Sequence, residues 1–300
     1  MWFKNLLIYC FTSPFQINVE DFEQKLNATP FVPCGSQDLA RAGWVAPMPE
    51  GELFSHTAGA CTLLCLRKQQ KILPGAAVAE ALEEKIREIE TGEARKVYRK
   101  ERKQIKDEIM ITLAPRALTR SSHTYAYIDE QKQWLIVNGG SANRAEELLT
   151  QLRTDIGSLP VVPLETRNQA ATLLTDWVRG GELPEGFALG EQCELRDVQE
   201  TTNTVKVRGQ DLRSDEVLQH IEAGKQVVKL ELHWREAIDF VIGDDLIVRR
   251  VRFRDELLEK IENLDDPRAQ FDQEFALMTM ELQRFVGEVI AAFGGEALPV

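Results

Sequence analysis

The fold depends most on residues 74–115, which read PGAAVAEALEEKIREIETGEARKVYRKERKQIKDEIMITLAP. Between Ala76 and Leu113 the chain has no proline and a single glycine, Gly92. Before this glycine, apolar residues recur at the spacing of one helix face, at Val78, Leu82, Ile86 and Ile89. After it, a second stripe contains Tyr98, Ile105 and Ile109. The pattern predicts two helices, or one long helix weakened at Gly92, and we expect this charged segment to project from the body.

The sequence on either side of this segment predicts short strands and helices. The strand candidates are Trp2–Phe11, pieces around Phe31 and Trp44, Ala60–Leu66, Thr124–Ile128, Trp134–Asn138, Val205–Arg208, Gln226–Trp234, Ala237–Ile242 and Leu246–Phe253. The helix candidates are Val19–Leu26, Ala142–Leu152, Leu173–Val178, Ser214–Glu222 and a C-terminal helix that ends at Phe293. Hairpin-length gaps between the late strands favour antiparallel pairing. The predicted class is therefore α+β with antiparallel sheets.

Three regions are expected from this order of elements. An N-terminal α+β lobe would contain residues 1–74 and 121–165, and a C-terminal α+β lobe would contain residues 166–300. Between the two parts of the first lobe lies a basic helical tip, residues 75–120.

Composition places the chain among ordinary globular proteins. Of its 300 residues, 43% are hydrophobic and 28% are charged. The apolar opening Trp2–Phe11 is too short to span a bilayer and lacks a cleavage site, so we expect a cytoplasmic protein without a membrane partner. The five cysteines are irregularly spaced, and only Cys61 and Cys65 lie close together. Because no second ligand pair accompanies them, we expect five reduced thiols and neither metal nor cofactor.

Basic residues are concentrated in one segment of an acidic chain. The net charge of the whole chain is −12, whereas residues 95–120 contain nine basic and three acidic residues, a net charge of +6. The nine are Arg95, Lys96, Arg99, Lys100, Arg102, Lys103, Lys106, Arg116 and Arg120. At helical spacing, Arg95, Arg99, Arg102 and Lys106 form one stripe, and Lys96, Lys100 and Lys103 form a second beside it. Phosphate binding depends on where cations gather rather than on their total.

The basic helix could also be a solvated surface. Long helices often carry many lysines and arginines, but usually with acidic partners interspersed, and Glu101 is the only acid within residues 95–106. This favours phosphate binding. The helix has one aromatic residue, Tyr98, on its apolar side, so stacking of single-stranded bases is not indicated.

Predicted strands supply further cations. Arg250, Arg252 and Arg254 alternate on one face, and Lys206 and Arg208 lie opposite Val205 and Val207. Each set alone is typical of a solvated sheet face. Together they are compatible with a basic concave surface on a protein with an acidic exterior.

No catalytic motif is present in the sequence. Gly224-Lys225 lacks the flanking residues of a phosphate-binding loop, and the four histidines are scattered. The carboxylate pairs Asp244-Asp245 and Asp265-Asp266 are typical of turns and helix starts. We expect no enzymatic activity.

An ordered set of segments resembles one known family. The segments are Trp2 to Leu6, Pro33 to Asp38, Gly43-Trp44-Val45, Lys71 to Pro74, Pro115-Arg116-Ala117, Gly157 to Leu164, Trp177-Val178-Arg179, Gln210-Asp211-Leu212, His220 to Lys225 and Gly294 to Ala297. No single segment is decisive, but the ordered set is similar to the recombination-associated RdgC family from residue 2 to residue 297.

This resemblance implies a structure and a function. Family members have a curved α+β protomer with a projecting helical tip, and two protomers close into a ring with tip meeting tip and base meeting base. The ring has a positively charged hole for duplex DNA, which is bound with little sequence preference, and single strands less clearly. Family members restrain RecA-dependent strand exchange and act in replication and recombination, which implies a nucleoid-associated homodimer. The resemblance implies no cofactor and no catalysis.

Two positions depart from the family pattern. The apolar residue after Pro-Arg-Ala, often Phe in the family, is Leu118 here and would seal the tip contact. The residue before Gln-Asp-Leu, often Lys, is Gly209 here, so that a cation is missing and Arg208 is its candidate replacement. The resemblance implies that Leu118, Gln210 and Asp211 lie at dimer contacts.

The hypothesis is that the basic helix and the arginine-bearing strands line the ring. The expected DNA contacts are the nine cations of residues 95–120 together with Arg208, Gln210, Arg250 and Arg252. A DNA-processing enzyme and a purely protein-binding regulator are the alternatives.

Overall fold

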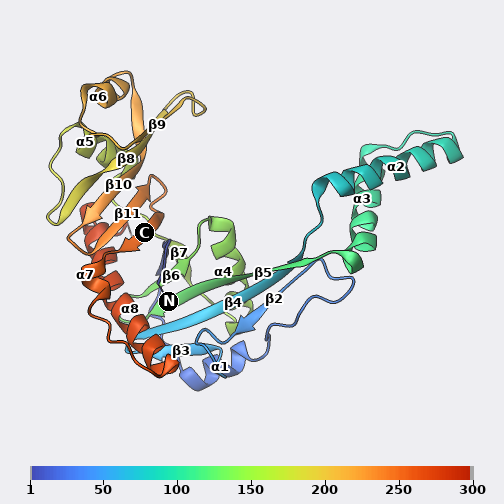
Figure 1. Cartoon of the computed structure of the whole chain (residues 1–300), viewed down its shortest axis with the longest axis horizontal. Helices are drawn as coiled ribbons and strands as arrows, with labels where there is room; N and C mark the ends of the chain where they lie inside the picture. The colour runs from blue at the N-terminus through green and yellow to red at the C-terminus, as the bar shows by residue number, and fades with distance from the viewer. Residues whose placement is uncertain (1, 298–300) are drawn as a thin grey trace.

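The computed structural model describes residues 2–297, in which helices and strands form two antiparallel sheets and a separate helical pair (Figure 1). The seven-stranded sheet has the order β2-β4-β5-β6-β1-β7, and β3 also pairs with β4. Its strands are β1 (Leu7–Phe11), β2 (Ala40–Val45), β3 (Ser55–Ala58), β4 (Cys61–Lys71), β5 (Thr119–Asp129), β6 (Trp134–Asn138) and β7 (Val161–Pro163). The predicted α+β class with antiparallel sheets is confirmed.

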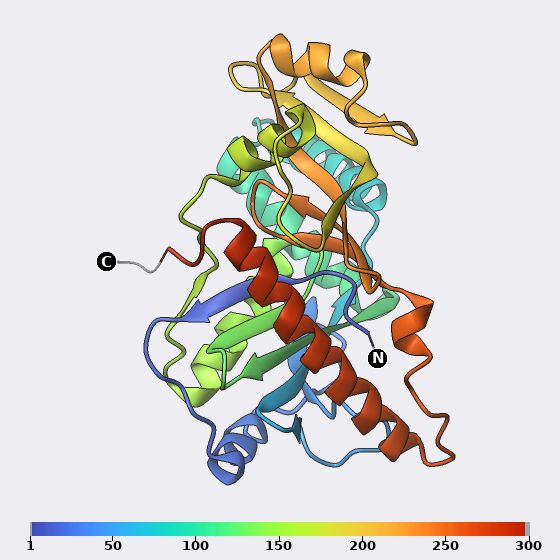
Figure 2. The ribbon, with the colours of Figure 1, turned by 90° about the vertical axis from the view of Figure 1, so that its left-hand side faces the viewer.

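Helices cover both faces of this sheet. Because successive side chains of a strand point to opposite faces, Ile8 and Cys10 join one core with α8 (Pro267–Ala292), whereas Leu7 and Tyr9 join another with α1 (Val19–Leu26) and α4 (Ala142–Ile156). This burial on both sides explains why β1 is apolar without alternation. Figure 2 shows α8 lying across one face of the sheet, and Figure 1 shows α4 on the other.

The five-stranded sheet has the order β12-β11-β10-β8-β9. Its strands are β8 (Phe187–Asp197), β9 (Thr204–Arg208), β10 (Lys225–Trp234), β11 (Ile238–Gly243) and β12 (Val248–Phe253). One face packs on α5 (Ala170–Arg179), α6 (Asp215–Glu222) and α8; a short helix, α7 (Asp255–Leu258), follows β12. The ring of Phe285 on α8 lies 5.5 Å from that of Trp234 and 4.8 Å from that of Phe240. The other face carries the charged side chains.

The two sheets share one core. The predicted strand Trp2–Phe11 is divided, since only Leu7–Phe11 joins the seven-stranded sheet. The preceding residues run along β12, where the Leu6 amide donates to the Val248 carbonyl over 2.8 Å and the Val251 amide donates to the Lys4 carbonyl over 2.9 Å. Helix α8, within the predicted C-terminal lobe, packs on the N-terminal sheet. The predicted lobes are therefore joined by a continuous apolar interior.

One predicted strand does not form, and one observed strand was not predicted. No strand forms around Phe31, where Pro30 and Pro33 lack the amide hydrogens that a ladder needs; only an isolated bridge joins Pro30 to Trp44. Strand β8 was not predicted, although it is central to the second sheet. All five cysteines are free thiols, as expected. Along residues 2–297, no helix combines the length and apolarity that a bilayer crossing requires.

The helical segment forms two helices, α2 (Gly75–Glu93) and α3 (Arg99–Leu113), followed by a short 3-10 turn, η1 (Ala114–Arg116). They lie at the end of the long β4 and β5 strands and project from the sheet (Figure 1). The chain turns after Glu93, at Ala94 (φ 50°), not at Gly92 itself. Because α3 begins at Arg99, the predicted helical stripes that included Arg95 and Lys96 were wrong.

Candidate nucleic-acid interface

The helical tip, residues 75–120, has a small apolar core of its own. Leu82 and Ile86 on α2 pack with Ile105 on α3. Val97, in the connection, packs against this cluster, and its amide donates to the Glu90 carboxylate over 3.0 Å. Tyr98 was expected on the apolar side, but 75% of its surface is exposed. The core orients the remaining faces of both helices to solvent.

Two of the predicted tip cations are occupied by acidic partners. Arg95 donates to both carboxylate oxygens of Glu101 over 2.6 and 2.7 Å and to Glu93 over 2.5 Å. Arg102 forms an ion pair with Glu83 of α2. The packing of α2 beside α3 brings Glu83 to Arg102, whereas Arg95 is held by acids two and six residues away in the sequence. Arg95 and Arg102 are therefore less available to phosphates than a helical wheel indicates.

The other cations of α3 and its connection are exposed and, within the described residues 2–297, form no ion pair: Lys96, Arg99, Lys100, Lys103 and Lys106. Arg99, Lys103 and Lys106 are spaced by four and three positions, so they share one helix face, away from Ile105. We call these three residues the α3 basic face. Its side chains extend into solvent and have no counter-ion in the described part of the chain, so they are available to phosphates.

The root of the tip combines cations with exposed apolar residues. Arg116 in η1 and Arg120 on β5 are exposed. Leu118 lies between them with 78% of its surface exposed, and its carbonyl accepts a hydrogen bond from the amide of the half-exposed Ile72 over 2.7 Å. The predicted tip-contact residue is thus available for an intermolecular contact.

The second group of cations lies on the open face of the five-stranded sheet. On β9, Lys206 and Arg208 are exposed and Val207 is buried, as the alternation predicts. On β12, Val251 and Phe253 are buried and Arg252 is exposed, also as predicted. The register shifts between Asp239 and Val241, where the left-handed Arg250 (φ 54°) forms a bulge. Period-2 reasoning therefore missed Arg249, which reaches the same face.

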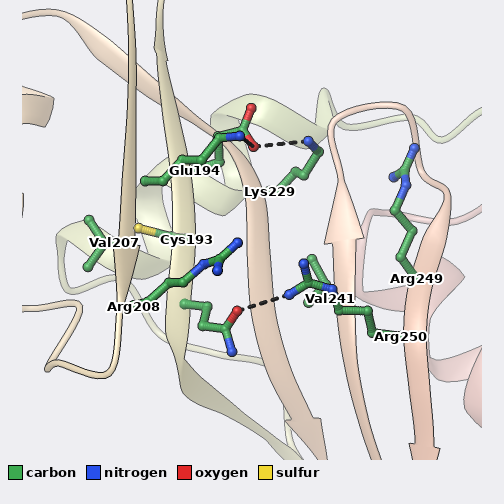
Figure 3. A pocket seen from close by; sticks show the side chains of 10 residues that line it. Cys193, Glu194, Val207, Arg208, Lys229, Val241, Arg249 and Arg250 are labelled. Carbon is green, nitrogen blue, oxygen red and sulfur yellow. Dashed lines mark hydrogen bonds and ion pairs between the residues drawn. The ribbon is translucent and has the colours of Figure 1, made fainter.

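Five strands enclose a depression of about 260 Å³ on this face, which we call the sheet pocket. Its lining residues are Gln192, Cys193, Glu194, Lys206, Val207, Arg208, Lys229, Val241, Arg249 and Arg250. In Figure 3 the Arg208 and Arg250 side chains point toward each other across the strands between them. Arg250 Nη1 donates to Gln192 Oε1 over 3.0 Å, and its amide donates to Asn5 Oδ1 over 3.3 Å.

Glu194 is the acidic residue of the sheet pocket. Its carboxylate lies 3.0 Å from Lys229 Nζ, 3.9 Å from Lys206 Nζ and, through the other oxygen, 3.6 Å from Arg196 Nη2. Burial alone would raise the pKa of Glu194, but the hydrogen bond and charge of Lys229, with the charges of Lys206 and Arg196, lower it below its ordinary value. The group is therefore an anion that holds the lysines in place. Sequence reasoning missed it.

The remaining arginines of this face fall into two groups, those that form ion pairs with acids of the chain and those that form none within the described residues. Arg249 donates to both oxygens of Asp245 over 2.9 and 2.5 Å. Arg254 lies 2.7 Å from Asp239. In the described part of the chain, Arg208, Arg250 and Arg252 form no ion pair, and all three are exposed. These are the three sheet cations expected at DNA.

The loop after β9 contains Gln210 and Asp211, which are predicted to lie at a dimer contact. Gly209 has a left-handed backbone (φ 69°). Gln210 and Asp211 are exposed, and Asp211 Oδ1 accepts a hydrogen bond from the Arg213 amide over 2.9 Å in the turn before α6. Arg208, one position before the glycine, faces the sheet pocket. The loop and the helical tip lie at opposite ends of the protomer, and both rise on the α4 side of the seven-stranded sheet (Figure 1).

Acidic residues and histidines do not assemble into a metal-binding cluster among residues 2–297. The carboxylate pairs occupy the predicted turn and helix start: Asp245 accepts from the Ile247 amide over 3.1 Å, and Asp266 caps α8 through the Arg268 amide over 3.0 Å.

Comparison with known proteins gives the family of this chain. A sequence profile of the family described as "Putative exonuclease, RdgC" matches residues 1–296. The chain belongs to the RdgC family. Relatives of this RdgC chain include proteins named "Recombination-associated protein RdgC" from Aeromonas hydrophila and Psychromonas ingrahamii, which are 44% and 42% identical to it, each over 99% of both chains. A relative of the same name from Sodalis glossinidius is 44% identical, over 99% of this chain and 98% of the relative. The expected family is confirmed, and with it an association with recombination.

Proposed function

We propose that two copies of this chain close into a ring around duplex DNA and hold it through phosphate contacts with little preference for sequence. The observation that carries this proposal is the segregation of cations. In a chain of net charge −12, cations that are exposed and form no ion pair among residues 2–297 gather on the α3 basic face and around the sheet pocket. Contacts to phosphates position a protein on DNA but carry no sequence information.

Two exposed ends of the protomer support the proposed dimer. Leu118 at the root of the tip and the Gln210-Asp211 loop after β9 are exposed. A twofold axis that joins tip to tip and loop to loop would give two isologous contacts. Such a curved pair encloses a space bordered by both basic surfaces. Encirclement explains how an acidic protein retains DNA without base contacts.

The biological role proposed here is modulation of RecA-dependent recombination and replication. A ring on duplex DNA occupies the substrate that strand exchange needs. Nucleoid association in the cytoplasm follows from non-specific duplex binding. Single strands would bind less well, because the exposed Tyr98 is the one aromatic residue among the tip cations.

The protein is proposed to bind DNA without cleaving it, although its family description names an exonuclease. The test incubates the purified protein with an end-labelled 30-bp duplex, first with EDTA and then with Mg²⁺ or Mn²⁺. We expect a mobility shift at moderate salt and an intact label under all conditions. Loss of the label in Mg²⁺ would favour an exonuclease, and absence of any shift would favour a regulator that binds only proteins.

A further inference from the structure

The sheet pocket is smaller than a site for a whole organic ligand. Its volume of about 260 Å³ lies below the common range of ligand pockets, roughly 300–1,000 Å³, and its rim is cationic. Val241 lines it and is buried, whereas the side chains of Cys193 and Val207 join the core on the opposite face of the sheet. Charge interactions at a surface that is partly removed from water are stronger than in bulk solvent. Such a site suits a small anionic group.

Two arginines are placed for an anion to bridge them. Arg208 and Arg250 come from the two edge strands of the sheet, β9 and β12, and point toward each other across the pocket (Figure 3). Gln192 and the left-handed backbone hold Arg250 in position. A guanidinium donates two parallel hydrogen bonds to phosphate oxygens, whereas a lysine contributes a point charge. Lys206 and Lys229 supply such point charges from the same pocket.

We propose that the sheet pocket binds one phosphate group of a phosphate ester, with Arg208 and Arg250 as its main ligands and Glu194 as the resident anion that competes with it. Glu194 organises Lys206 and Lys229 while the pocket is empty, but its negative charge opposes an incoming phosphate. Glu194 therefore limits the affinity of the pocket for phosphate. The inference rests on the proposed function in that DNA supplies the phosphate, as an internal phosphodiester or as a terminal phosphate at a strand end.

The experiment measures binding of inorganic phosphate to the full-length protein by isothermal titration in phosphate-free buffer. The variants are Glu194→Gln and the double variant Arg208→Gln, Arg250→Gln. Arg179→Gln is the matched control, because Arg179 at the end of α5 is an exposed arginine that does not line the pocket. Removal of the like charge at position 194 should tighten binding at least about threefold. Loss of both guanidinium groups should weaken it by about tenfold or more, and the control should match the wild type.

A gain of affinity in Glu194→Gln cannot result from misfolding, so this variant tests the proposal even if the double variant is unstable. Equal phosphate binding by the wild type and all variants, or no tighter binding by Glu194→Gln, would overturn the proposal.

Duplexes with and without a 5′-phosphate then distinguish the two sources of phosphate. A preference for the 5′-phosphorylated 20-bp duplex that disappears in the double variant assigns the pocket to strand ends. Equal binding of both duplexes, weakened in the double variant, assigns it to the internal backbone. If the wild type binds phosphate through the pocket but binds no duplex, the proposed function is refuted and the phosphate site is retained. If it binds duplex but no phosphate, only the proposed phosphate site is refuted.

Discussion

The α3 basic face allows a quantitative test of phosphate contact. The perturbation is the triple variant Arg99→Gln, Lys103→Gln, Lys106→Gln, which removes three exposed cations that form no ion pair with any residue of the described range 2–297. Each phosphate neutralised contributes about 0.9 to the slope of log K against log salt. The variant should therefore lower the slope by up to about 2.7 per protomer. Between 50 and 200 mM salt, the wild type should lose about 40-fold more affinity than the variant for each protomer engaged.

The assay is fluorescence anisotropy of a labelled 30-bp duplex at several salt concentrations. The matched control is Arg95→Gln, Arg102→Gln, which removes two cations of the same tip that are held by Glu101, Glu93 and Glu83. Its slope should change much less per charge removed. Equal effects per charge in both variants would refute the distinction between paired and unpaired cations. An unchanged slope in the triple variant would remove the α3 basic face from the mechanism.

Three further predictions concern assembly and stability. Leu118→Asp should weaken dimerisation in sedimentation equilibrium by at least about tenfold, because it would bury an unpaired charge at the tip contact; Val198→Asp, also at an exposed apolar position, should not, and equal dimerisation of both variants would count against the tip contact. Phe285→Ala should lower the free energy of unfolding in urea by about 3–5 kcal/mol, since this buried ring contacts Trp234 and Phe240; a loss below about 1 kcal/mol would contradict that packing. Burial alone would raise the pKa of Asp245, but hydrogen bonds from Arg249 and its charge lower it below the ordinary value. The stability from this pair is therefore complete above the unfolded pKa of about 3.9 and is lost as pH falls through the lower folded pKa. Asp245→Asn should make the free energy of unfolding in urea depend less on pH in the acid range. An unchanged pH dependence would disprove the linkage.

Local patterns predicted much of the fold. The apolar spacing of residues 78–89 gave the buried face of α2, and Leu82 and Ile86 are indeed buried. Alternation on β9 placed Lys206 and Arg208 correctly, because a regular strand has a period of two. The sequence predicts strand β4 only over Ala60–Leu66, because the polar residues Arg67–Lys71 lack an apolar pattern. In the structure, the pairing of β4 with β5 continues to Lys71.

Long-range contacts account for what could not be predicted. The partner of Arg102 is Glu83 of α2, 19 residues earlier, which only the packing of the two helices brings near. The bulge at Arg250 depends on the pairing of β12 with β11. In the sequence, only the adjacent arginines Arg249 and Arg250 indicate that strict alternation is broken in this strand. The division of the first predicted strand at Leu6 depends on β12, more than 240 residues later.

Encirclement is tested most directly by topology. The purified dimer is bound to a closed circular plasmid at low salt, moved to high salt, and compared with the same plasmid cut once. Since high salt suppresses phosphate contacts, a closed ring should remain on the circle and leave the linear form through its ends. Equal loss from circular and linear DNA would contradict encirclement and leave only surface binding by the two groups of cations.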